Sequence, residues 1–136
     1  MNIVDHSGDG RFDDFLDHVL KTCHRMTRTP LGKTVSLILV DDTTMRELNA
    51  TYRGKDETTD VLTFPADRDD DLGDVFISMP QMMRQATELE HSEKRELAFL
   101  TIHGFLHALG HTHDDEACRN TMFDLQKKIL DDIDMN

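Results

Sequence analysis

The sequence predicts an α/β (α+β) fold in one domain, and two observations lead to this prediction. The chain has 136 residues, which suits a single domain with a substantial core. Short apolar segments of strand length alternate with longer segments in which apolar residues recur at helical spacing. Elements in this order are expected to form a small sheet with helices packed on it.

The first part of the chain predicts a helix, a strand and a second helix. Residues 11–27 carry apolar side chains at helical spacing, which indicates an amphipathic helix. Residues 35–40, Val-Ser-Leu-Ile-Leu-Val, have the composition of a largely buried strand. Either Asp41 or Asp42 can cap the next helix, which is expected to end at about Thr51.

The middle of the chain predicts a loop, two strands and a helix. The polar segment 53–59 is expected to be a surface loop. Residues 61–64 and 72–78 are predicted strands, and the acidic run 67–71 between them is expected to be a solvated turn. A helix over 80–90 should follow, because a proline suits its first turn.

Two further helices are expected in the last part of the chain. Ser92 can cap the first of them, which is apolar almost all round and is therefore expected to be buried. Gly110 supplies the natural end of this helix. The last helix, over about 115–130, is expected to pack through an inner face made of Cys118, Met122, Leu125 and Ile129.

Composition limits the classes of function. The 27 acidic and 15 basic residues give a formal charge of −12, which disfavours strong nonspecific binding of nucleic acid. Cys23 and Cys118 are far apart and form no CxxC motif, which favours a reducing compartment. No segment approaches the roughly 20 apolar residues of a membrane span, and no export signal is recognisable. A cytoplasmic protein without a membrane partner is therefore expected.

The segment 103–113, His-Gly-Phe-Leu-His-Ala-Leu-Gly-His-Thr-His, carries the chemistry. His103 and His107 are four residues apart, so their imidazoles project from the same side of a helix. Gly110 then lets the backbone turn, so that His113 can approach the pair. Three neutral imidazoles make a suitable zinc site with an open fourth position, which is the arrangement of catalytic zinc centres.

Other interpretations of this segment stay open. A single buried histidine is usually a core residue, although three polar rings at this spacing all need partners. His111 can replace His113 on spacing alone, and Cys118 or Asp114 can close a structural site as a fourth ligand. Three imidazoles also accept nickel, copper or iron. Gly104 stands where the HExxH zinc peptidases carry their glutamate base, which disfavours a peptidase.

Four blocks of the sequence resemble the YbeY family of bacterial endoribonucleases and rRNA-maturation factors. One block alone would be weak, but four in the family's order are specific. The resemblance covers most of the chain, from about residue 35 to residue 130. The blocks are LNATYRGKD at 48–56, TTDVLTFP at 58–65, LGDVFIS at 72–78 and the histidine segment at 103–113.

The resemblance implies one domain over 1–136, with a short mixed four-stranded sheet flanked by about five to six helices. It implies one zinc ion on His103, His107 and His113, and it places the family's arginine at Arg53. A guanidinium in this catalytic position can hold a phosphate through two parallel hydrogen bonds, with Lys55 as a weaker second contact.

The function implied by the resemblance is zinc-dependent, single-strand-specific endoribonuclease activity. The family is associated with maturation of the small-subunit rRNA 3′ end and with ribosome quality control. The expected partners are therefore RNA and the small ribosomal subunit or its proteins. Two rival functions are a non-catalytic, zinc-stabilised ribosome-assembly factor, which the acidic charge favours, and a metallo-hydrolase for small esters or amides.

Two features depart from the family pattern. The family usually has Tyr-Asp before the third histidine, where this chain has His111 and Thr112. The missing carboxylate would be suited to orient a ligand or to assist proton transfer, and Asp114 is a substitute for part of that role. The N-terminus is also short, so the first strand is expected to be thin or truncated within residues 1–4.

Overall fold

The computed structural model describes residues 2–5, 10–66, 68–112 and 114–133. Within these residues the strands form one sheet in the order β1-β2-β4-β3. β1 and β4 both run parallel to β2, whereas β3 runs antiparallel to β4, so the sheet is mixed. The strands are β1 (Asn2–Asp5), β2 (Thr34–Val40), β3 (Val61–Pro65) and β4 (Asp71–Ser78).

Five helices accompany the sheet in the described part of the chain. They confirm the predicted α/β class and the predicted alternation of helices with strands. None of the described helices has both the length and the apolar character of a membrane span. The helices are α1 (Asp13–Thr27), α2 (Asp42–Arg53), α3 (Met79–Glu88), α4 (Glu93–Ala108) and α5 (Glu116–Ile133).

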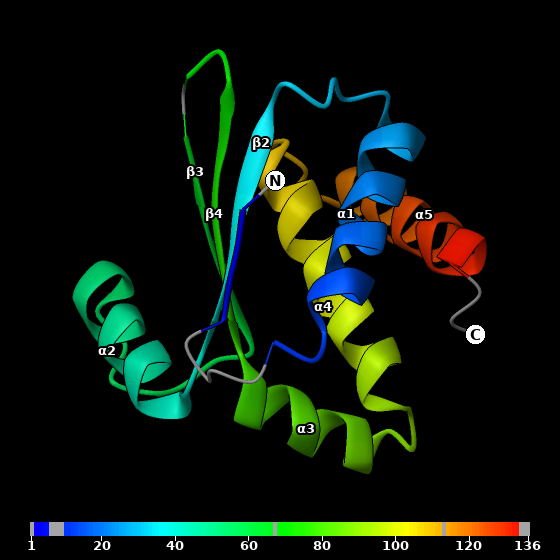
Figure 1. Ribbon diagram of the computed structural model, residues 1–136. Coiled ribbons are helices and arrows are strands. Elements are labelled where there is room, and N and C mark those ends of the chain that lie inside the picture. The colour runs from blue at the N-terminus through cyan, green and yellow to red at the C-terminus, as the bar shows by residue number, and fades with distance from the viewer. Residues whose placement is uncertain (1, 6–9, 67, 113, 134–136) are drawn as a thin grey trace.

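The sheet lies between α2 and the helices α1, α4 and α5, whereas α3 lies at one end of the sheet and contacts α2 (Figure 1). Successive side chains of a strand point to opposite faces, so β2, β3 and β4 each contribute to two apolar clusters. Leu37 and Leu39 of β2 lie in the large core with residues of α1, α4 and α5. Ile38 packs instead against the smaller cluster, which contains Met45 of α2 and Leu62 of β3.

Helix α4 lies at the centre of the larger layer and contacts β3, β4, α1, α3 and α5 (Figure 1). Its central residues, including Leu100, Ile102 and Phe105, are almost completely buried, as the apolar sequence predicted. Ser92 caps it, because the Arg95 amide donates to the Ser92 hydroxyl at 3.1 Å. At the other end Gly110 has a φ of +100°, which favours glycine, and the chain turns there as predicted.

Three predicted boundaries or faces were wrong. Arg53 is the last residue of α2 and not part of a loop, because the helix runs two residues beyond Thr51. Asp71 belongs to β4, where it pairs with Thr34 of β2, so the acidic turn is shorter than predicted. Cys118 is exposed, and burial on the inner face of α5 begins only at Met122. The acidic residue Asp67 lies outside the described residues.

Candidate metal centre

Two histidines of the buried helix α4 face each other. Nε2 of His103 and Nε2 of His107 are 3.0 Å apart, and the two ring centroids are separated by 4.5 Å. The spacing of four residues places both rings on one side of the helix, which confirms the geometry expected from the sequence. Both histidines are partly exposed, so their polar rings reach the surface from a helix whose central part is otherwise mostly buried.

The ring of His103 is held from two further directions. Its Nδ1 lies 2.9 Å from Oε1 of Gln126, which projects from α5 and is 2% exposed. Because a carbonyl oxygen only accepts, this contact places a proton on Nδ1 of His103. The ring of Phe99, one turn earlier on α4, stacks on His103 with a centroid distance of 6.2 Å. These contacts fix both the tautomer and the orientation of the ring.

The histidine pair lines a cleft of about 580 Å³ that is open to the surface. β3 forms part of its wall, and the hydroxyl of Thr63 donates to the backbone oxygen of Gly104 at 3.4 Å. The cleft therefore lies where α4 packs on the edge strand of the sheet. The lining residues are Arg53, Asp60, Val61, Leu62, Thr63, Pro65, His103, His107, Gly110, His111 and Thr112.

Arg53 reaches this cleft from the C-terminal end of α2, although α2 lies on the other face of the sheet. The structure thus brings the predicted arginine and the predicted histidine pair to one cleft. Lys55, the weaker candidate for a phosphate contact, is exposed and does not line the cleft. An exposed guanidinium beside paired imidazoles is suited to hold a phosphate next to them.

The third predicted ligand, His113, lies outside the described residues. The flanking residues His111 and Thr112 line the cleft, whereas Asp114 is exposed and does not. Within the described ranges no three His, Cys, Asp or Glu side chains are grouped closely enough to hold a metal. His113 therefore stays a prediction, and so does the complete ligand set.

Cys118, the alternative fourth ligand, is exposed in the first turn of α5 and does not line the cleft.

The thiol of Cys118 is expected to react with an aromatic disulfide reagent in the folded protein, although Asp115 raises the pKa of this thiol. Cys23 is fully buried in α1, and burial raises the pKa of its thiol to about 12. Titration should detect one reactive thiol before unfolding and two after it. Two reactive thiols in the folded protein would contradict the packing of α1.

Two residues of the site escaped sequence reasoning. Gln126 was not predicted, yet it interrupts the apolar stripe of α5 between Met122 and Ile129, and this interruption was the available signal. Asp60 also lines the cleft, where its Oδ1 accepts from the backbone amide of Val61 at 2.8 Å. An acidic residue before a short strand gives no comparable signal on its own.

The fold and the cleft define a class of protein, in which a buried helix of an α/β domain presents paired histidines beside an arginine. The family model described as endoribonuclease YbeY matches residues 4–134. The chain therefore belongs to the endoribonuclease YbeY family.

Individual relatives agree with this assignment. The chain is similar to proteins named endoribonuclease YbeY from Acholeplasma laidlawii (46% identity over 100 residues, 72% of this chain and 73% of the relative) and Geobacillus thermodenitrificans (38% over 128 residues, 85% and 82%). A third is from Moorella thermoacetica (49% over 109 residues, 71% and 70%). A solution structure of a Thermotoga maritima protein aligns with a TM-score of 0.70 at 30% identity, covering 97% of this chain and 87% of that one.

Proposed function

We propose that this endoribonuclease cuts RNA at the cleft of Arg53, His103 and His107, with one zinc ion bound there. Membership of the endoribonuclease YbeY family makes the protein a hydrolase that cleaves within RNA. The observation that carries the proposed location is the approach of the two Nε2 atoms to 3.0 Å inside an open cleft. His113 is proposed as the third ligand.

The residues present fit a zinc ion. Two nitrogens that each lie about 2.0–2.1 Å from a tetrahedral zinc are separated by roughly 3.3 Å, close to the observed separation of the Nε2 atoms. Gln126 holds the proton of His103 on Nδ1, so Nε2 presents a lone pair. A ligand histidine usually donates its second ring N–H to an oxygen in this way. Imidazole nitrogen is a ligand of the kind that zinc prefers.

When bound, zinc would supply Lewis-acid polarisation of a phosphoryl oxygen and activation of water. The chain's own residues position the substrate. Arg53 holds the scissile phosphate through its planar guanidinium and offsets the charge that develops during displacement at phosphorus. Val61, Leu62 and Thr63 of β3 line the same cleft as Arg53, so RNA bound there would contact this strand as well.

The proposed substrate is a single-stranded region of rRNA, at the 3′ end of the small-subunit RNA, with a further part in ribosome quality control. The proposed partner is the small ribosomal subunit or its proteins, in the cytoplasm. The net charge of −12 suits contact with basic ribosomal proteins better than with bare RNA. The alternative of a non-catalytic assembly factor is disfavoured, because the relatives are named endoribonucleases.

Arg53→Ala is expected to lower kcat for RNA cleavage by about 100- to 1000-fold, which is the usual effect of losing one preorganised donor to a developing charge. Because Arg53 is exposed at the end of α2, the fold should be unaffected. Arg53→Lys keeps the charge but loses the bidentate geometry, so an intermediate loss is expected.

The measurement is cleavage of a small-subunit precursor RNA that extends beyond the mature 3′ end, using zinc-loaded protein. Lys55→Ala is the matched control, because it removes an exposed cation two residues away that does not line the cleft. Equal cleavage by wild type, Arg53→Ala and His107→Ala would point to a contaminating nuclease and overturn the proposal. Cleavage of small esters that survives in Arg53→Ala would instead favour the metallo-hydrolase alternative.

A further inference from the structure

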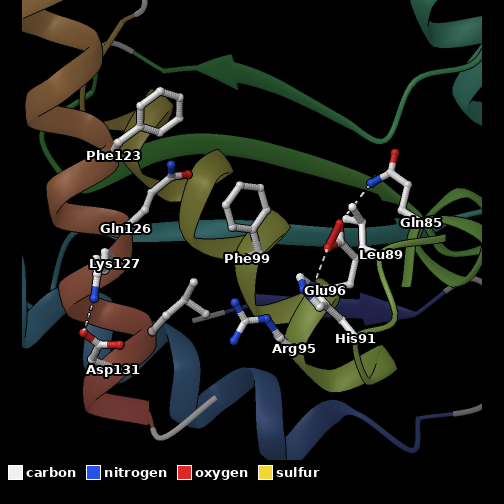
Figure 2. A pocket seen from close by; sticks show the side chains of 11 residues that line it. Gln85, Leu89, His91, Arg95, Glu96, Phe99, Phe123, Gln126, Lys127 and Asp131 are labelled. Atoms are coloured by element: carbon white, nitrogen blue, oxygen red, sulfur yellow. Dashed lines mark hydrogen bonds and ion pairs between the residues drawn. The ribbon is translucent and has the colours of Figure 1, made fainter. Parts of the chain in front are cut away.

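A second pocket, of about 490 Å³, lies between α4 and α5 (Figure 2), and we call it the α4–α5 pocket. Most of its wall is apolar, from Leu89, Phe99, Phe123 and Leu130. Figure 2 shows the rings of Phe99 and Phe123 on the two helices that border it. A volume of this size and a mainly apolar wall are typical of pockets that bind small organic groups.

The α4–α5 pocket shares a wall with the histidine cleft. Phe99 and Gln126 line the pocket, and the same two side chains contact the ring of His103, one by stacking and one by a hydrogen bond. Phe99 precedes His103 by four residues, which is about 6 Å along a helix axis. A strand bound across His103 and His107 can therefore place a neighbouring group in this pocket.

The polar groups of the pocket indicate what kind of ligand it accepts. Nε2 of Gln126 is a buried donor without a hydrogen-bond partner among the described residues. Glu96 is 3% exposed, and its Oε2 accepts from Nε2 of Gln85 at 3.0 Å. A buried amide donor without an acceptor is costly, so a ligand that brings a carbonyl or ring nitrogen is favoured over a purely aliphatic one.

The charge around the pocket also suits RNA. Arg95 and Lys127 lie there together with Glu96 and Asp131, so the charged side chains balance. The whole chain carries a formal charge of −12, so a neutral region next to the histidine cleft gives a polyanion a path with less repulsion. Aromatic walls, a buried amide donor and a neutral rim together match a nucleobase, which stacks on aromatic rings and hydrogen-bonds at its edge.

We propose that the α4–α5 pocket binds one base of the RNA strand whose phosphate lies at the histidine cleft; this inference rests on the proposed function. The base stacks on the aromatic wall, with an acceptor on its edge directed to Gln126. The pocket thereby selects single-stranded RNA, because a base inside a duplex is stacked and paired and cannot enter it.

The test is a titration of the full-length protein with adenosine 5′-monophosphate, followed by NMR signals of the backbone amides. Signals around Phe99 and Phe123 should shift, and ribose 5-phosphate, which lacks the base, should not shift them. Phe123→Leu keeps an apolar side chain but removes the ring, and should weaken binding about tenfold. Phe15→Leu, the same change on α1 outside this pocket, is the matched control and should bind as wild type does.

Two results would overturn the inference: no shift at the α4–α5 pocket, or an equal shift with ribose 5-phosphate. The titration involves no cleavage, so it separates the two proposals. Wild type that cuts RNA but shows no shift refutes the pocket alone. Wild type that shows the shift but cuts no RNA refutes the proposed function and supports nucleotide binding in the pocket.

Discussion

His107→Ala is expected to lower the rate of RNA cleavage by more than roughly 100-fold. Loss of a residue that only hydrogen-bonds to a metal ligand usually costs about 10- to 100-fold, and loss of a ligand itself should cost more. The reason is that His107 supplies one of the two facing Nε2 atoms on which the proposed zinc site depends. The fold should survive, because the His107 ring lies at the surface of the cleft and not in the core. Cleavage of the precursor RNA and zinc content per chain are the two measurements.

His111→Ala is the matched control for this prediction. His111 lines the same cleft, but its spacing makes it a weaker candidate than His113 for the third ligand. His113→Ala should therefore resemble His107→Ala, whereas His111→Ala should keep most of the zinc and most of the activity. The opposite ranking would make His111 the third ligand. Full activity and full zinc content in His107→Ala would contradict the proposed role of the histidine pair in zinc binding and cleavage.

The second large effect is expected from Gly104→Ala, which should destabilise the protein by about 1–2 kcal/mol. A Cβ at this position would overlap Cγ1 of Val75, which is 1% exposed, and would lie 3.4 Å from Cγ2 of Val61. Overpacking of this kind costs about 1–3 kcal/mol, and valine is stiff about χ1 and cannot easily yield. The better helix propensity of alanine offsets about 1 kcal/mol of the cost at most.

The free energy of unfolding in urea measures this effect. Gly32→Ala is the control, because nothing lies within 4 Å of the added Cβ there, and it should be close to neutral. Val75→Ala removes the atom that is overlapped, so Gly104→Ala should cost much less in that background. An equal cost in both backgrounds would show that packing of α4 on β4 is not the cause.

The same contact explains the glycine in the histidine motif. The sequence showed only that Gly104 occupies the position of the peptidase glutamate. In the structure α4 packs at this point so closely on β3 and β4 that even a methyl group is excluded. A glutamate would therefore need a different packing of the helix on the sheet, which sequence spacing alone does not reveal.

Local signals predicted most elements, because apolar periodicity and capping residues act within a few positions. Ser92 and Gly110 bound α4 as predicted, and Asp41 is the residue that caps α2 through the amide of Thr44. The predicted burial of Cys118 was wrong. Helical spacing shows which side chains share one face of α5, but it does not show how much of that face a neighbouring element covers. Burial along that face of α5 begins at Met122.

The site was predictable only where its residues are close together in the sequence. The spacing of His103 and His107 alone placed both rings on one helix face, whereas the approach of Arg53 depends on how α2 and β3 are arranged around the sheet. Only the family resemblance indicated the arginine. Gln126 orders the His103 ring from another helix, and contacts between distant segments leave little trace in a single sequence.

The most direct test of the zinc centre is X-ray absorption at the zinc K-edge of the zinc-loaded protein. We expect nitrogen ligands at about 2.0–2.1 Å and no sulfur, with imidazole scattering that falls when His107 is replaced by alanine. A sulfur at about 2.3 Å would place Cys118 at the metal and contradict the proposed centre, as would a spectrum that His107→Ala leaves unchanged.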